Sequence, residues 1–227
     1  MPVTKRTVGD SNGTVKKSTV TSKNSNSKFS QFQKHLMTGI SYMIPVLIMG
    51  GLLGALSQLI PYMFMGVDPS MSIVDAINTG SYTVSSENLL KFAYILQTFG
   101  FTLFGFAIPI FAAFAAQSIG GKTALICGFI GGVVANNPIE TLTMVDGAYE
   151  PVAPAPSGFF GGLLIAFLIG YFVRFLNNHI KVSHNWMAFK TTFLIPLISV
   201  LVTMILMIYV ITPIAVSYTH LTLPTKA

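Results

Sequence analysis

The stretch KHLMTGISYMIPVLIMGGLLGAL, residues 34–56, decides the fold of this chain. It opens an apolar run, Leu36–Val67, that contains no Asp, Glu, Lys or Arg. An α-helix rises about 1.5 Å per residue, so about 20 apolar residues cross the roughly 30 Å hydrocarbon core of a bilayer. The run exceeds this length and therefore predicts a membrane-spanning helix, with Pro61 marking its outer end.

Four further runs without acidic or basic side chains follow the first. They are Phe92–Gly121, Thr123–Ile139, Pro151–Val173, whose helix is expected from the N-cap candidate Ser157, and Thr191–Thr225, whose span is expected over Thr191–Ala215. The third run, Thr123–Ile139, is of marginal length for a crossing, so it either crosses the membrane or re-enters as a hairpin. The chain is 52% hydrophobic and 9% charged, whereas soluble domains carry about 25% charged residues. We therefore predict an all-α, polytopic transmembrane helix bundle with about five membrane-spanning segments.

The formal net charge of +6 belongs to the N-terminal tail. Residues 1–35 hold seven Lys and Arg against one acid, whereas acidic and basic residues after His35 are equal in number. A basic segment beside an apolar helix indicates membrane orientation or contact with anionic lipid, and we expect no nucleic-acid partner. Residues 1–31 are rich in Ser and Lys and have no apolar period, which predicts a disordered tail or linker.

The connectors between the apolar runs alternate in charge. Lys122 and the segment Arg174–Lys190 are basic, whereas residues 66–91 and 136–156 each carry three acids. Cytoplasmic loops favour Lys and Arg. A cytoplasmic N-terminus therefore places both basic connectors in the cytoplasm, provided that the third run crosses the membrane.

The most promising polar cluster is NNPIE, residues 136–140. Amides and carboxylates offer hydrogen-bond donors and acceptors in fixed directions, as sugar hydroxyls require. Asn136, Asn137 and Glu140 are thus weak candidates for substrate binding. The alternative is an ordinary external loop, because Asp146 and Glu150 follow soon after.

Other residue types exclude several chemistries. The single cysteine, Cys127, lies inside an apolar run, and the four histidines form no metal-binding pattern. We predict no metal site, no cofactor and no catalytic residue. A GFxGG pattern occurs twice, at residues 128–132 and 158–162, which predicts close helix packing, with a polar site between broken helices as the alternative.

From about Phe32 to Ala215 the chain resembles the membrane component (IIC) of a fructose-type sugar phosphotransferase system. The resemblance rests on an ordered series of segments: KHLMTGISYMIPVLIMGGLLGAL at 34–56, FGFAIPIFAAFAAQSIGGKTAL at 104–125, ICGFIGGVVA at 126–135, SGFFGGLLIAFLIGYFV at 157–173 and FKTTFLIPLISVLVTMILMIYVI at 189–211. It implies a multi-pass permease subunit of the bacterial inner membrane, homodimeric when full length and in contact with lipid. It also implies a sugar substrate, fructose or a related hexose or polyol, and IIB and IIA partners. Phosphoryl transfer would then occur on a separate IIB protein, not on this chain.

The chain departs from that family in three ways. Residues 136–157 are longer and more polar than the turn typical of the fructose branch, and the family's GGPxNKAA-like and SEGAIPF-like segments do not occur. The ending VSYTHLTLPTKA, residues 216–227, resembles translated adapter sequence. We therefore expect a partial EIIC domain over residues 32–216 and an artefactual or unstructured tail over 217–227. A self-contained five-helix membrane enzyme or scaffold protein is the alternative.

Overall fold

The computed structural model describes residues 28–83, 87–145, 148–183, 186–214 and 217. In chain order the elements are α1 (Lys28–Met65), α2 (Ile73–Thr79), α3 (Glu87–Gly120), α4 (Lys122–Asn136), β1 (Thr141–Val145), β2 (Ala148–Val152), α5 (Gly158–His179), α6 (Met187–Phe189), η2 (Lys190–Leu194), α7 (Ile195–Leu206) and η3 (Met207–Ile211). The last four, of which η2 and η3 are π-helical turns, lie in one continuous helix, Met187–Ile214. Residues 1–27 of the predicted tail 1–31 and residues 218–227 of the predicted tail 217–227 lie outside the described residues, whereas the Ser217 hydroxyl donates to the Pro213 carbonyl at 2.9 Å.

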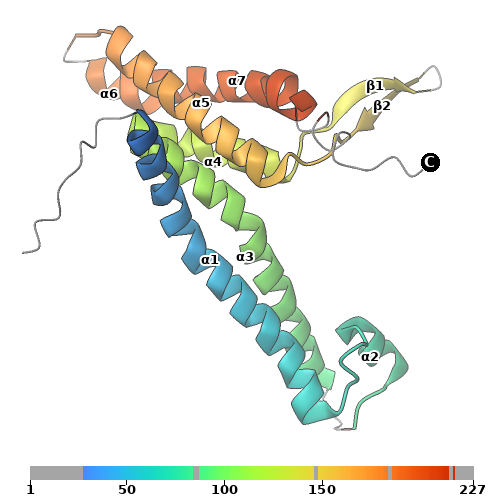
Figure 1. The fold of residues 1–227 in the computed structure, drawn as a ribbon. Coiled ribbons are helices and arrows are strands. Elements are labelled where there is room, and N and C mark those ends of the chain that lie inside the picture. Colours follow the sequence, from blue (N-terminus) through green and yellow to red (C-terminus); the bar gives the residue numbers. More distant parts are fainter. Residues whose placement is uncertain (1–27, 84–86, 146–147, 184–185, 215–216, 218–227) are drawn as a thin grey trace, which may run out of the picture.

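The helices α1 and α3 form a long antiparallel pair, called the arm below. Figure 1 shows them side by side, with α2 at the end of the arm that is distant from α5 and α7. The backbones approach closely where Gly50 faces Gly100, because a Cβ atom built on either would lie 3.0 Å from the carbonyl oxygen of the other. Glycine thus allows the contact that small residues provide between membrane helices.

The helices α4, α5 and α7 pack together at the other end of the molecule, and α4 and α5 also pack against α3 (Figure 1). Both GFxGG segments serve this packing. A Cβ atom on Gly132 would lie 2.6 Å from Cα of Pro109, and one on Gly162 would lie 2.6 Å from a methyl group of Ile108. The glycines are therefore required for close packing, as the first of the two interpretations predicted.

Four helices are long and apolar enough to cross a membrane: α1, α3, α5 and the helix Met187–Ile214. The third apolar run forms α4, which has 15 residues and is therefore about 22 Å long, shorter than the hydrocarbon core. The structure thus has four helices of spanning length where about five spans were expected, and the third apolar run forms only a short apolar helix. Polytopic helical architecture is confirmed.

Several boundaries differ from the expected ones. The helix α1 begins at Lys28, so residues 28–31 are helical rather than part of the tail. It also continues past Pro61 to Met65, because a proline removes one hydrogen bond but neighbouring packing retains the helix. Ser157 does hold the N-cap position of α5, but its hydroxyl donates to the carbonyl of Ala135 at 3.4 Å instead of capping.

Two small elements were not predicted by the apolar runs. The acidic connector 136–156 contains an antiparallel hairpin of β1 and β2, in which Thr141 pairs with Val152 and Val145 with Ala148. The hairpin is an addition to the predicted helix bundle and does not change its class. The first acidic connector contains α2, which Ser72 caps by accepting a hydrogen bond from the Asp75 amide at 3.1 Å.

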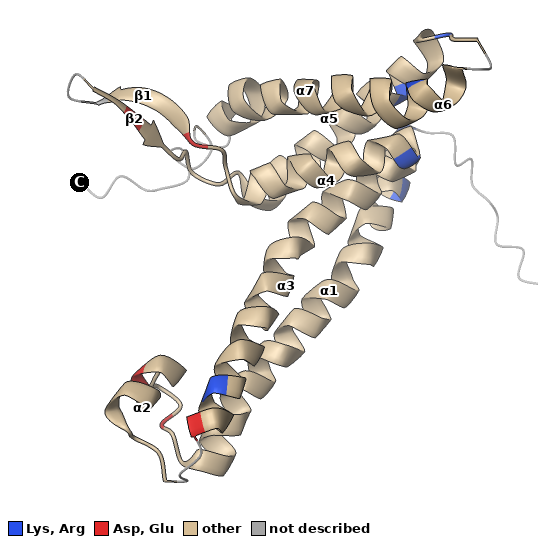
Figure 2. Ribbon diagram, turned by 180° about the vertical axis from the view of Figure 1, so that it is seen from behind, with Lys and Arg blue, Asp and Glu red and all other residues tan. Residues whose placement is uncertain are grey.

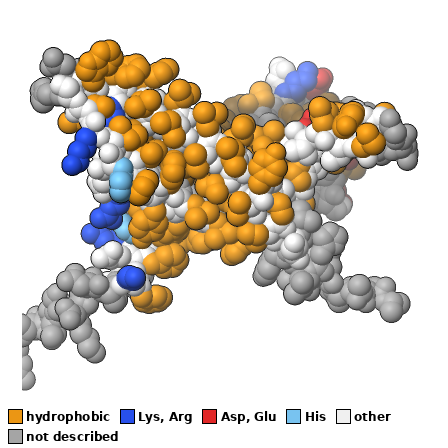
Figure 3. Space-filling model, turned by 90° about the horizontal axis from the view of Figure 1, so that it is seen from above, with side chains coloured by type: hydrophobic (Ala, Val, Ile, Leu, Met, Phe, Trp, Pro, Cys, Tyr) orange, Lys and Arg blue, Asp and Glu red, His pale blue; other side chains and the backbone are white. Residues whose placement is uncertain are grey.

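The charged side chains separate toward opposite ends of the molecule. Figure 2 shows Lys and Arg mainly at the start of α1, around α6 and at the neighbouring helix ends, whereas Asp and Glu lie near α2, the start of α3 and the hairpin. Lys91 is the exception, and it pairs with Glu87 at 2.6 Å. Viewed from above, apolar side chains cover most of the surface between the two ends (Figure 3). This distribution is that of a protein whose middle faces lipid.

Candidate functional site

A groove forms where α4 ends beside the part of α3 that contains Gly105 and Pro109. Its lining residues are Thr102, Gly105, Phe106, Pro109, Val133, Asn136 and Asn137, and its volume is about 260 Å³. Pro109 has no N–H, so the carbonyl of Gly105, four residues earlier in α3, has no normal helical donor. Asn136, the last residue of α4, donates its Nδ2 to that carbonyl at 3.3 Å.

The depth of the groove follows from helix length. The part of α3 between Gly105 and Gly120 is similar in length to α4, which runs from Lys122 to Asn136 and has 15 residues. At about 1.5 Å per residue, Gly105 and Asn136 both lie about 22 Å from the basic end of the helices. A hydrocarbon core of about 30 Å therefore encloses the groove. Polar groups at such depth occur where helices are interrupted and line a cavity.

Two of the three predicted site residues meet in this groove. Asn136 is half-buried and Asn137 is exposed, and both line it. Glu140 is exposed and lies outside the lining, because the chain turns away toward β1 after Pro138. Sequence reasoning missed Thr102 and the Gly105 carbonyl, although Pro109 within an apolar run indicated a carbonyl in need of a donor.

The basic end is held together by contacts between helices. His35 on α1 and Ser118 on α3 are 2.8 Å apart through Nδ1 and Oγ. Lys190 is buried, and its ammonium group donates to the carbonyl oxygens of Asn177, at 3.0 Å, and Ile180, at the end of α5. A cation at a helix C-terminus is favoured by the helix dipole. Lys190 thus fixes the connection between α5 and α6.

Cys127 is buried in the core between α3, α4, α5 and α7. The buried hydrophobic cluster around it includes Ala112, Ala116 and Ile169, and its Sγ donates to the Thr123 carbonyl at 3.6 Å. Among the residues that the structure describes, no group of three His, Cys, Asp or Glu side chains is placed to hold a metal ion. A phosphorylated side chain at Cys127 would bury about two negative charges in this core.

Long apolar helices with a polar groove at their breaks define a polytopic α-helical membrane protein. Comparison with known families specifies it further. The chain belongs to the phosphotransferase system EIIC family, whose model matches residues 37–224.

Curated relatives share this region. Over 185 residues the chain is 45% identical to the "Fructose-like permease IIC component 1" of Escherichia coli (strain K12), an alignment covering 81% of this chain and 45% of the relative. It is 31% identical over 188 residues to the "PTS system fructose-specific EIIABC component" of Mycoplasma pneumoniae (strain ATCC 29342 / M129 / Subtype 1), covering 77% of this chain and 24% of the relative. It is 29% identical over 180 residues to the "Fructose-like PTS system EIIBC component" of E. coli K12, an alignment covering 79% of this chain and 32% of the relative. The chain thus spans less than half the length of these relatives. No solved structure matches it significantly.

Proposed function

We propose that this chain contributes the helices of a sugar-translocating permease subunit of a phosphoenolpyruvate-dependent phosphotransferase system. The carrying observation is the groove in which Asn136 and Asn137 meet the Gly105 carbonyl at membrane depth, within an EIIC fold. Its amides and hydroxyl are neutral donors and acceptors, which suit a hydroxylated substrate. Relatives named as fructose-like permeases make fructose or a related hexose or polyol the proposed substrate.

The proposed orientation has the N-terminus in the cytoplasm of a bacterium and the chain in the inner membrane. Support comes from the separation of charges, since Lys and Arg cluster at the start of α1 and the end of α5 (Figure 2). Basic residues are retained on the cytoplasmic side of membrane proteins. The hairpin and α2 then lie on the outer side. Anionic lipid headgroups are expected to contact the basic end.

The proposed partners are IIB and IIA components and a second copy of the full-length subunit. Relatives that combine EIIC with IIB and IIA in one chain support the first two. Phosphoryl transfer is assigned to the IIB component, because Cys127 is buried among apolar side chains. The basic end offers Arg174 and Lys181 as contacts for a phosphorylated partner.

A chimera tests the proposal. Residues 1–214 would be joined to the remaining C-terminal part of the E. coli relative that is 45% identical, in cells that lack their own fructose permeases. We expect uptake of radiolabelled D-fructose that requires the IIB component, and a loss of at least about tenfold with Asn136→Leu. The matched control Asn78→Leu changes an exposed amide on α2. The proposal would be refuted if the chimera inserted into the membrane but showed no IIB-dependent uptake of fructose, another hexose or mannitol.

The alternative, a self-contained membrane enzyme or scaffold, would be favoured if Glu140→Gln abolished an activity of this chain alone.

A further inference from the structure

A second cavity lies at the other end of the arm, away from the Asn136 groove. It has a volume of about 710 Å³, within the range of small-molecule sites. Residues from three segments line it: Ala55, Gln58, Leu59 and Tyr62 of α1, Pro69, Ser70, Met71 and Ser72 before α2, and Gln97 of α3. The α1 residues recur at helical spacing and so form one face.

This cavity lies near the far end of the arm, beside the polar loop that precedes α2. The part of α1 from His35 to Gln58 and the part of α3 from Gln97 to Gly120 are equal in length. At about 1.5 Å per residue, each places its glutamine about 35 Å from the basic end of the helices, farther than the roughly 30 Å hydrocarbon core extends. Since α1 and α3 run antiparallel, both amides reach the same level from opposite directions.

The cavity wall formed by the loop before α2 is held in place. The Thr83 amide donates to the Met65 carbonyl at 2.9 Å, and the Val67 amide donates to the Pro61 carbonyl at 3.2 Å. Ile73 and Ala76 of α2 are buried in a small core with Leu90 and Ala93 of α3 and with Met65 and Val67. The loop is thus anchored on both sides of the cavity before any ligand binds.

The polar groups that face this cavity are available for a ligand. In the part of the chain that the structure describes, Gln58, Tyr62 and Gln97 have no hydrogen bond from their side chains. A glutamine amide offers donors and acceptors together, and tyrosine adds a hydroxyl to an apolar ring. This combination suits a neutral molecule with several hydroxyl groups.

The surrounding charge disfavours anions. Asp68 and Asp75 flank the loop, and Ser70 donates both its amide, at 2.8 Å, and its hydroxyl, at 2.6 Å, to the Asp68 carboxylate. These two hydrogen bonds hold the pKa of Asp68 below its usual value, so it is ionised at neutral pH. A phosphorylated sugar would meet these negative charges, whereas a neutral sugar would not.

We propose that the cavity between Gln58, Tyr62 and Gln97 is an outer binding site for a neutral saccharide or polyol, separate from the groove at Asn136. It would bind the unphosphorylated sugar in preference to its phosphate ester, and its outward placement rests on the proposed orientation. The site does not require the proposed function to hold, since binding at this surface needs only the arm and α2.

Binding to the 227-residue chain in lipid nanodiscs tests the site, with D-fructose and D-mannitol as probes and D-fructose 1-phosphate as the anionic comparison. We expect saturable binding of a neutral probe, weakened about tenfold by Gln58→Leu or Gln97→Leu through lost hydrogen bonds. Gln33→Leu, the same change at the exposed opposite end of α1, leaves affinity unchanged. Fructose 1-phosphate should not compete.

A second measurement locates the ligand without relying on those variants. Ala55→Cys places a thiol in the cavity wall, whereas the native Cys127 is buried. A neutral sugar that occupies the cavity should slow maleimide labelling of the new thiol. Absence of saturable binding by both neutral probes, equal affinity in all variants, or labelling that sugar does not slow would each overturn the inference. Failure of the chimera to transport, with binding and protection intact, would overturn the proposed function only.

Discussion

Asn136, at the end of α4, donates its side-chain amide to the carbonyl of Gly105 in the middle of α3, at 3.3 Å. This hydrogen bond replaces the helical donor that the Gly105 carbonyl lacks, because Pro109 has no N–H for the carbonyl four residues earlier. One interruption of α3 and the end of α4 are thereby joined. The same bond fixes the amide that lines the groove proposed for substrate.

The coupling between Asn136 and Pro109 predicts a non-additive effect on stability. Asn136→Leu should lower the free energy of unfolding by about 1 kcal/mol, since it leaves the Gly105 carbonyl unpaired. In the background of Pro109→Ala that carbonyl regains an intrahelical donor, so the cost of Asn136→Leu should fall. A double-mutant cycle from reversible unfolding in mixed micelles measures the difference. Equal costs in both backgrounds would contradict the hydrogen bond as the cause.

Close packing at Gly132 predicts a position-specific effect of adding one methyl group. Gly132→Ala would place its Cβ about 2.6 Å from Cα of Pro109, so α3 and α4 must separate, at a cost of about 1–3 kcal/mol. Gly54→Ala is the matched control, because nothing lies within 4 Å of its added Cβ. That control should be neutral or stabilise α1 by up to about 1 kcal/mol. Thermal unfolding of both variants in detergent gives the comparison, and similar loss in both would contradict the packing argument.

Hydropathy alone predicted the long helices because lipid imposes a simple length requirement on them. Leu36–Val67 and Phe92–Gly121 correspond to α1 and α3 with their polar ends added. The boundaries moved because helical hydrogen bonding continues into residues such as Lys28 and Glu87, whose charges end an apolar run but not a helix. Charge therefore marks where lipid ends, not where the helix ends.

The helix α2, the hairpin and the part of the groove contributed by α3 could not be predicted from apolar runs alone. The pair Ser72 and Asp75 has the spacing of a helix cap, and alternating β-branched residues precede Asp146-Gly147, a sequence common in hairpins. Both signals are local and lie in polar connectors, where hydropathy is uninformative. The contact between Asn136 and Gly105 joins residues 31 apart in sequence, and hydropathy does not say which helices will meet. Pro109 indicated a free carbonyl, but only the fold supplied its donor.

The contacts of Lys190 predict that removing its charge destabilises the end of α5 but not the whole protein. Its ammonium group donates to the Asn177 and Ile180 carbonyls at the end of α5. Lys190→Met retains the apolar stem but leaves these carbonyls without that donor, so the last turn of α5 should open more often. Amide hydrogen exchange near His179 should accelerate about fivefold or more, by the usual cost of one lost hydrogen bond. Lys181→Met, an exposed lysine nearby, is the control, and equal exchange in both variants would contradict the assigned role.

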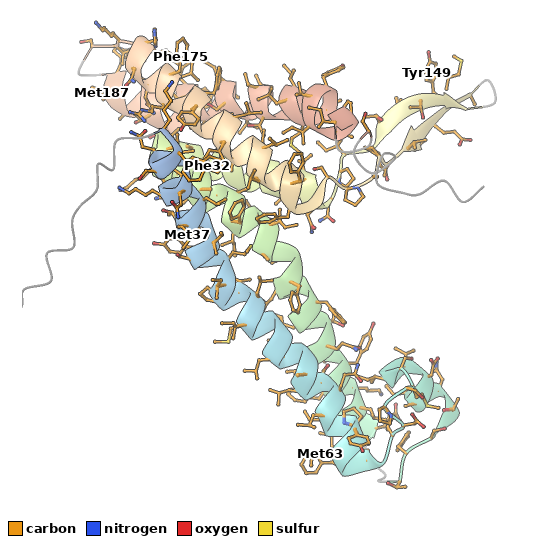
Figure 4. All side chains as sticks on the ribbon, in the orientation of Figure 1. Phe32, Met37, Met63, Tyr149, Phe175 and Met187 are labelled. Carbon is orange, nitrogen blue, oxygen red and sulfur yellow. The ribbon has the colours of Figure 1, made fainter. Side chains whose placement is uncertain are left out.

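The separation of charges predicts the sidedness of the chain. Tyr149 on the hairpin is 69% exposed and projects from β2 at the end of the molecule opposite to Phe175 and Met187 (Figure 4), whereas Lys181 lies in the exposed basic connection between α5 and α6. Because basic connections stay in the cytoplasm, a membrane-impermeant maleimide should label Tyr149→Cys in intact cells. It should label Lys181→Cys only after the membrane is permeabilised. The native Cys127 is buried, and the unsubstituted chain measures its background. Labelling of Lys181→Cys in intact cells would reverse the orientation. It would also move the saccharide site between Gln58 and Gln97 to the cytoplasmic surface, where a phosphorylated product rather than incoming sugar would be its neighbour.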